Sequence, residues 1–126
     1  MSWQSYVDNQ LVGSGKVSRA AILGLRGGVW ATTNGFTISP EEQKAIIEVF
    51  NDPTVAQDRG VRVSGYKFFT LVADKAKLYG ERETKGIILY KTKQTVLVAE
   101  YDAPIQNPEA ASVTESLADY LTSAGY

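Results

Sequence analysis

The feature that most limits the fold is a series of short strand-like segments in the second half of the chain. Residues that favour strands are concentrated in Val61 to Val63, Tyr66 to Ala73, Gly86 to Thr92 and Thr95 to Tyr101, with Leu78-Tyr79 as a candidate fifth. Only short polar segments separate them. Parallel strands need a long crossover connection, usually a helix, so this close spacing predicts an antiparallel sheet.

A hairpin is predicted before these strands. The segment Lys16 to Leu25 is rich in small and β-branched residues, Arg26-Gly27-Gly28 is typical of a turn, and Val29 to Thr33 continues the extended pattern. Neither this turn nor Gly13-Ser14-Gly15 has the glycine spacing of a phosphate-binding loop, so both are interpreted as turns.

Two helices are predicted between the hairpin and the strands. The segment Ser39-Pro40-Glu41-Glu42 combines an N-cap serine, a proline at the first helical position and a glutamate that completes a capping box. This helix is expected to end near Phe50. Asn51-Asp52-Pro53 then favours a short helix through Gln57.

Helices are also predicted at both ends of the chain. Ser2 is a candidate N-cap for a helix from Trp3 to about Val12. Asn107-Pro108-Glu109 is expected to cap and start the closing helix. The apolar stripe of that helix is predicted to contain Val113, Leu117, Leu121 and Ala124.

Composition excludes many functions. The 126 residues contain neither histidine nor cysteine, which removes imidazole bases, thiolate nucleophiles and the usual zinc and copper ligand sets. A mechanism based on carboxylate, lysine or tyrosine remains open. The formal net charge of −1 provides no field that attracts nucleic acid. We therefore expect no cofactor and no nucleic-acid partner.

The length predicts a single domain, residues 1–126. No apolar run is long enough to span a bilayer, and the N-terminus lacks the basic and apolar regions of a signal peptide. These observations predict a cytosolic protein.

Aromatic residues lie close to both ends, where chains are usually polar. Trp3 and Tyr6 belong to the predicted first helix, and Tyr120 and Tyr126 to the end of the last one. They are either ordinary core residues or parts of one surface. If the two helices pack side by side, their rings share a surface with Trp30 of the hairpin beneath.

Several motifs occur in one order along the whole chain. They are Met-Ser-Trp-Gln-Ser-Tyr-Val-Asp-Asn, Ala-Ala-Ile-Leu-Gly, Val-Trp-Ala-Thr-Thr, Gly65-Tyr66-Lys67, Leu78-Tyr79-Gly80, Lys91-Thr92-Lys93 and Leu-Ala-Asp-Tyr-Leu. In this respect the chain resembles the profilin family, most of all the short profilins of amoebae and fungi. The resemblance implies an α+β fold with a central antiparallel sheet of about six to seven strands. The terminal helices would pack on one face and the smaller helices on the other.

The resemblance also implies a function without catalysis. Profilins bind monomeric actin, regulate its polymerisation, promote nucleotide exchange on actin, bind proline-rich segments of assembly factors such as formins, and interact with phosphoinositide lipids. We accordingly expect a monomer in the cytoplasm and cytoskeleton.

Specific residues match the family's binding positions. For the proline-rich segment these are Trp3, Tyr6, Trp30, Tyr120, Leu121 and Tyr126. For actin they are Lys67, Thr70, Arg82, Lys91, Gln106, Ser112 and Glu115. The candidate phosphoinositide residues are Lys75, Lys77, Lys91 and Lys93, which equally suit a solvated sheet edge.

The chain departs from the family at one place. Where many relatives carry arginines, it has Val72 and Ala76, with Lys75 and Lys77 nearby. Lysine lacks the bidentate fork of arginine. An alternative function is therefore a phosphoinositide-dependent signalling module with weakened actin binding. A small-molecule enzyme on a similar scaffold is a third alternative, disfavoured by the absence of a convergent acid-base motif.

Overall fold

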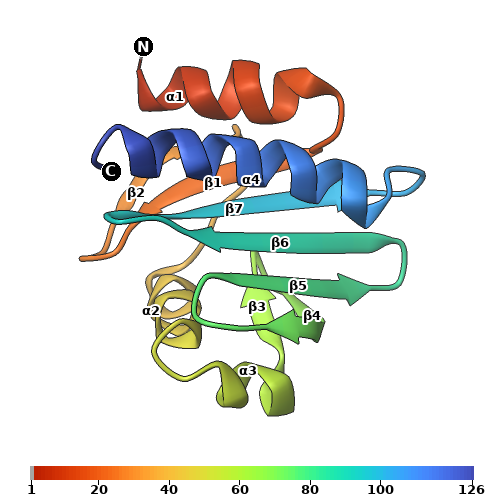
Figure 1. Cartoon of the computed structure of the whole chain (residues 1–126). Helices are drawn as coiled ribbons and strands as arrows, with labels where there is room; N and C mark the ends of the chain where they lie inside the picture. The colour runs from red at the N-terminus through yellow and green to blue at the C-terminus, as the bar shows by residue number, and fades with distance from the viewer. Residues whose placement is uncertain (1) are drawn as a thin grey trace.

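A seven-stranded antiparallel sheet forms the centre of the computed structural model, which describes residues 2–126 (Figure 1). The strand order is β2-β1-β7-β6-β5-β4-β3, and every neighbouring pair is antiparallel. The strands are β1 Arg19–Gly24, β2 Val29–Thr32, β3 Val61–Val63, β4 Tyr66–Ala73, β5 Lys77–Arg82, β6 Lys85–Lys91 and β7 Thr95–Asp102. The predicted sheet is confirmed, and the Leu78-Tyr79 segment belongs to the full strand β5.

The terminal helices cover one face of the sheet, and the two internal helices lie at the other face (Figure 1). The helices are α1 Trp3–Ser5, α2 Pro40–Val49, α3 Pro53–Arg59 and α4 Asn107–Ser123. This arrangement confirms the α+β prediction. The α3 helix ends at Arg59, two residues beyond the predicted Gln57. Gly60 caps it, with a φ of 68° that suits glycine.

The helix predicted from Trp3 to Val12 is present but is not α-helical throughout. After α1, residues Tyr6–Leu11 form a π-helix, and Val12–Ser14 form a 3₁₀ turn. The Ser2 side chain accepts a hydrogen bond from the Ser5 backbone N–H, as expected of an N-cap. We call residues 3–14 the N-terminal helical segment.

Glutamates close the capping boxes of both long helices. The Ser39 hydroxyl accepts from the Glu42 N–H at 3.1 Å, and the Glu42 carboxylate accepts from the Ser39 N–H at 2.9 Å, as predicted. The N-cap predicted for α4, Asn107, is wrong by one residue. Its N-cap is Gln106, in extended conformation, and Asn107 is already helical. The Glu109 carboxylate accepts from the Gln106 N–H at 3.2 Å, which identifies Gln106 as the cap.

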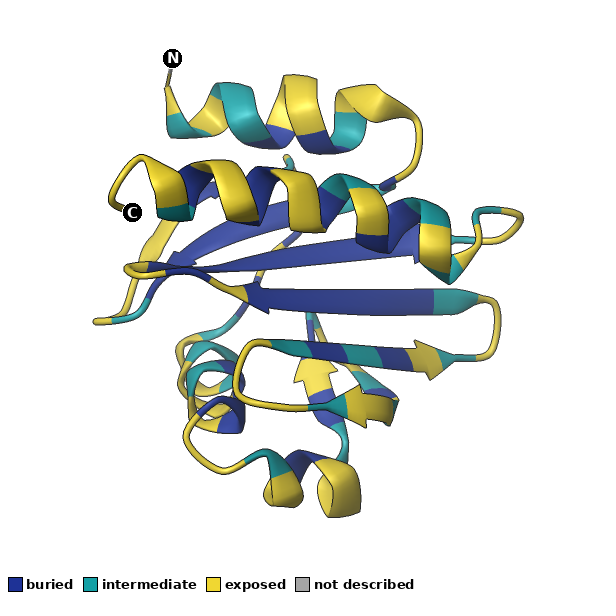
Figure 2. Ribbon diagram, viewed as in Figure 1, coloured by how far each residue is buried: buried dark blue, intermediate teal, exposed yellow. Residues whose placement is uncertain are grey.

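A separate apolar core lies on each face of the sheet. The core under the terminal helices includes Val7, Leu11, Ile22, Ile88, Leu97, Ala110, Leu117, Ala118 and Leu121. The other includes Phe36, Ile46, Phe50, Phe68, Leu78, Ile87, Leu89 and Val98. Strands β6 and β7 are buried along almost their whole length because they contribute to both (Figure 2).

The predicted apolar stripe of α4 needs correction. Leu117 and Leu121 are buried and Val113 is half-buried, but Ala124 is exposed because the helix ends at Ser123. Small residues fill the rest of the buried face, where they allow close approach to the sheet. The buried residues are Ala110, Ala111, Thr114, Leu117, Ala118 and Leu121.

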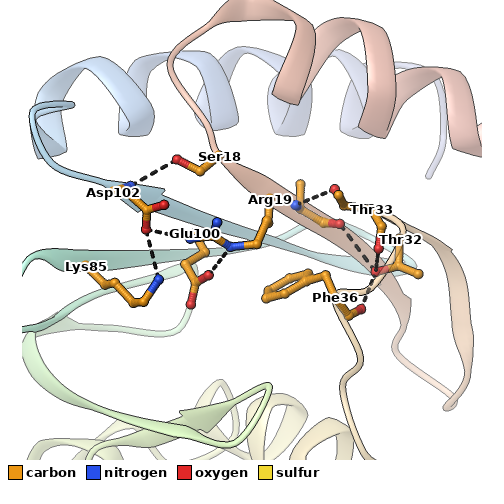
Figure 3. Close-up of polar contacts among 9 residues, drawn as sticks. Ser18, Arg19, Thr32, Thr33, Phe36, Lys85, Glu100 and Asp102 are labelled. Carbon is orange, nitrogen blue, oxygen red and sulfur yellow. Dashed lines mark hydrogen bonds and ion pairs between the residues drawn. The ribbon is translucent and has the colours of Figure 1, made fainter.

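An ionic network links β1, β6 and β7 (Figure 3). The Arg19 guanidinium contacts Glu100, whose side chain is 3% exposed, and it also contacts Asp102 at 2.5 Å. Lys85 reaches the same Asp102 oxygen at 3.1 Å. The Arg19 hydrogen bond, supported by Lys85, holds the pKa of Asp102 below its usual value despite some burial. The Arg19–Asp102 and Lys85–Asp102 ion pairs therefore favour the folded state only while Asp102 is ionised.

Candidate functional site

An aromatic cluster forms where the two terminal helices meet the hairpin. The Trp3 ring is at its centre, with ring-centroid distances of 4.8 Å to Trp30, 5.1 Å to Tyr126 and 5.6 Å to Tyr6. Tyr6 continues the row to Tyr120 at 6.2 Å. The tilted and edge-on ring orientations are those that aromatic pairs prefer. Five of the six residues predicted for the proline site therefore lie together.

The position of Trp30 depends on a glycine in the neighbouring strand. A Cβ atom at Gly24 of β1 would lie 2.5 Å from the Trp30 indole nitrogen and 3.0 Å from the Gly27 carbonyl oxygen. Such a distance is far inside van der Waals contact. Gly24 thus allows the Trp30 indole to lie against the β1 backbone, beside Trp3.

Tyr126 is positioned by the backbone that follows α4. Gly125 has a φ of 96°, which turns the chain back, and the Tyr126 N–H donates to the Leu121 carbonyl at 2.8 Å. The Tyr126 carbonyl accepts from the Thr92 hydroxyl at 2.8 Å and from the Gln94 N–H. The β6–β7 turn thereby holds the Tyr126 ring against Trp3.

The cluster presents aromatic faces and hydrogen-bond donors to solvent. Trp30, Tyr120 and Tyr126 are 38%, 55% and 42% exposed, whereas Trp3 and Tyr6 are half-buried. Within residues 2–126, neither indole N–H has a hydrogen-bond partner. Interaction with the Tyr120 phenol raises the pKa of Tyr6 above that of an ordinary tyrosine.

Leu121 differs from the other five predicted proline-site residues. It is 1% exposed and belongs to the core beneath the terminal helices. Its position on α4, next to Tyr120, makes it a support for the aromatic row.

The predicted actin residues on the strands already make internal contacts. The Thr70 hydroxyl donates to the Ala56 carbonyl of α3 at 2.7 Å. The Arg82 guanidinium lies 5.4 Å from the centre of the Tyr66 ring and donates to the Lys67 carbonyl at 3.4 Å. Lys67, Thr70 and Arg82 lie on the paired strands β4 and β5, whereas Lys91 lies at the opposite end of β6, because Arg82 pairs with Lys85 and Lys77 with Tyr90.

The other predicted actin residues belong to α4 and the loop before it. Gln106, Ser112 and Glu115 are exposed. Glu115 accepts from the Tyr90 hydroxyl of β6 at 2.7 Å, and the Tyr90 and Tyr79 hydroxyls are 3.1 Å apart. The pKa of Tyr90 is raised, mainly by burial and to a lesser extent by these contacts with Tyr79 and Glu115. Glu115 thus connects α4 to the sheet next to the other candidate residues.

Sequence reasoning missed an exposed apolar ridge on β4. Phe69 is 61% exposed, Leu71 57%, Tyr66 46% and Val72 43%. The apolar run had predicted an ordinary strand, but β4 lies beyond β5, away from the terminal helices (Figure 2). A register shift between Thr70 and Val72 also disturbs its alternation. Tyr66 lies on the same face as buried Phe68, beside Arg82, whereas Phe69 lies on the opposite face; the exposed apolar side chains of β4 mark a candidate interface.

The candidate lipid lysines lie at one end of strands β4 to β7. The Lys91 N–H donates to the Ala76 carbonyl at 2.8 Å, which brings the β4–β5 turn, with Lys75 and Lys77, next to the end of β6. Lys77 lies over the Tyr79 ring at 5.4 Å. Lys93, in the following turn, also lines a cavity beside Trp30.

The described part of the chain offers neither a metal-binding cluster nor a membrane-spanning helix. Residues 2–126 contain no group of three or more histidine, cysteine, aspartate or glutamate side chains arranged to hold a metal ion. None of the helices in the same range combines the length and apolar character that crossing a bilayer requires.

Comparison with known proteins agrees with this architecture. The Profilin family model matches residues 1–126. The chain is 42% identical to Profilin-2 of Acanthamoeba castellanii over 126 residues, with both chains fully covered, and 42% identical to the profilin of Saccharomyces cerevisiae over 127, again with full coverage. The crystal structure of A. castellanii profilin II superimposes with a TM-score of 0.96, covering 99% of this chain and 100% of that one. The chain belongs to the profilin family.

Proposed function

We propose that this protein binds monomeric actin and regulates its polymerisation, promotes nucleotide exchange on actin, and binds proline-rich segments of assembly factors of the formin type. The observation that carries the proposal is the row of rings Trp30, Trp3, Tyr6 and Tyr120, with Tyr126 beside Trp3, on a chain that belongs to the profilin family. As a family member it is a binding protein and not an enzyme.

The aromatic row suits a polyproline II helix. Such a helix is preformed, loses little entropy on binding, and presents flat rings and free carbonyls. The unpaired indole N–H groups of Trp3 and Trp30 supply donors for those carbonyls, and the exposed faces of Tyr120 and Tyr126 supply packing surface. Mouse profilin IIa, which shares the fold at 22% identity, is seen in complex with a double repeat from the FH1 domain of mDia1.

We assign actin binding to the β4–β6 region together with the start of α4. The apolar ridge of β4 supplies the buried centre that a stable protein interface needs. Cations lie at both ends of this region, Lys67 and Arg82 at one end and Lys91 at the other. At the places of the family arginines, Val72 is 43% exposed and Ala76 is exposed, so contact there is apolar. Phe69 and Leu71, with the largest exposed fractions on the ridge, are its expected energetic centre.

The two proposed surfaces lie on different parts of the molecule. The proline surface is formed by the N-terminal helical segment, the end of α4 and β2, whereas the actin surface is formed by β4 to β6 and the start of α4; β1 and β7 lie between β2 and β6 (Figure 1). Both partners can then be bound at once. Holding actin beside a proline-rich assembly factor raises its effective concentration there.

We further propose a cytoplasmic location at the cytoskeleton, and contact with phosphoinositide lipids through Lys75, Lys77, Lys91 and Lys93. The first three of these are brought together by the pairing of the β4–β5 turn with β6. Each lysine near an anionic membrane contributes about 1 kcal/mol. Lipid binding of this size is reversible and salt-sensitive.

Two binding assays test the proposal. Titration with a proline decamer should change tryptophan fluorescence saturably, and a glycine-serine peptide of equal length should not. In the second assay the protein should slow spontaneous assembly of monomeric actin and accelerate release of its bound nucleotide. Lys67→Glu should weaken actin binding and spare the proline peptide, with Lys44→Glu on α2 as the charge-matched control. Lipid binding without actin binding would instead favour the phosphoinositide-dependent signalling module.

A further inference from the structure

A cavity adjoins one end of the aromatic row. It has a volume of about 580 Å³ and lies between the β1–β2 turn and the β6–β7 turn. Its lining residues are Gly24, Leu25, Arg26, Gly27, Trp30, Lys93 and Gln94. The indole of Trp30 therefore forms part of the row and also a wall of the cavity.

The charge of this cavity is entirely positive among its described lining residues. Arg26 and Lys93 come from turns on opposite sides of it, and no aspartate or glutamate is present in the lining. Both side chains belong to exposed residues, and within residues 2–126 neither forms an ion pair or a side-chain hydrogen bond. Two unneutralised cations beside an aromatic wall form a receptor for an anionic side chain.

The opposite end of the row has different electrostatics. There the last ring is Tyr120, and the next residue toward the helix start, Asp119, is exposed and acidic. A ligand that lies along the row therefore meets positive charge beyond Trp30 and negative charge near Tyr120. A neutral proline segment does not detect this difference, but a charged one does.

We propose that the Arg26–Lys93 cavity binds acidic residues that flank the proline-rich segment, and thereby selects both the partner and its orientation on the aromatic row. The inference rests on the proposed proline-peptide function. Carboxylates next to the prolines enter the cavity once the rings have bound the segment, because tethering raises their local concentration. A lipid headgroup lacks that tether and would meet only two cations here, which makes the peptide the better match.

The test compares three kinds of peptide, five peptides in all, on the same protein. They are a proline decamer, the same decamer with two glutamates at one end, and the same decamer with two lysines there; each tagged peptide is made in both orientations. In low salt we expect at least one acidic peptide to bind roughly three- to five-fold more tightly than the neutral decamer, the gain shrinking in high salt. A lysine tag should not raise the affinity at the peptide end where the glutamate tag does.

Paired variants locate the effect. R26Q/K93Q should bind the neutral decamer as the wild type does and lose the preference for the acidic peptide. Arg62→Gln, an exposed arginine on β3, is the matched control and should retain the preference. Equal affinity for all tags, or a preference that persists in R26Q/K93Q, would overturn the inference. The inference would also be overturned if R26Q/K93Q lost binding to phosphoinositide vesicles while its preference for the acidic peptide was unchanged. Failure of the neutral decamer to bind the wild type would refute the proposed function itself.

Discussion

Replacing Trp3 by alanine should abolish most of the affinity for proline-rich peptides. A tryptophan buries roughly 150–250 Å² in full, and Trp3 is already partly buried, so we take about a third of that area, roughly 60 Å², as available to a ligand. At about 25 cal/mol per Å² this area contributes about 1.5 kcal/mol. One hydrogen bond from the indole N–H contributes about 1 kcal/mol more. The expected loss is therefore about 2.5 kcal/mol, or roughly 70-fold in the dissociation constant.

Trp3→Phe separates the two contributions. It keeps an aromatic ring beside Trp30 and Tyr126 but removes the N–H donor, so we expect a loss of about 1 kcal/mol, roughly five-fold. Calorimetric titration with a proline decamer measures both variants, and circular dichroism checks that each is folded. A folded Trp3→Ala protein that binds the decamer within two-fold of the wild-type affinity would refute the assignment of the aromatic row as the proline-binding surface.

Three further outcomes follow from the structure. Gly24→Ala should displace the Trp30 indole, lowering stability by about 1–3 kcal/mol and peptide affinity by roughly five-fold, whereas unchanged peptide affinity would contradict the packing argument. Phe69→Asp should reduce actin binding at least ten-fold in a co-sedimentation or exchange assay while leaving proline binding intact; loss of both would indicate misfolding. Arg19→Gln should cost about 2 kcal/mol of unfolding free energy at neutral pH, because Glu100 is left buried without its cation. Since the pKa of Asp102 is lowered in the fold, the part of the stabilisation that comes from the Arg19–Asp102 ion pair is present above about pH 4 and is lost as pH falls through the folded pKa of Asp102. Urea titrations should then show that the difference in unfolding free energy between the wild type and Arg19→Gln becomes smaller in acid. A difference that stays constant with pH would argue against the network.

The sequence predicts the elements well because the local signals are strong and agree with one another. The capping box of Ser39 and Glu42 and the closely spaced strands are local features, and each appears where expected. The order of the strands is not local. The sequence patterns do not predict it, since periodicity does not say which strands are neighbours.

Some features of the site depend on tertiary contacts that leave little trace in sequence. Glu42 accepts from the Ser64 and Gly65 N–H groups at 3.2 and 2.8 Å, in addition to capping α2, and no pattern links those positions. The apolar ridge of β4 is another case: a strand with apolar residues on both faces predicts burial on both. Whether a face is exposed depends on how far α4 extends over the sheet.

The central claim is that one molecule binds a proline-rich segment and monomeric actin through separate surfaces. The direct measurement is sedimentation velocity of a fluorescent proline decamer bound to the protein, before and after addition of monomeric actin. We predict that the peptide signal shifts to a larger species that contains all three components. Return of the signal to the position of free peptide when actin is added would contradict the claim.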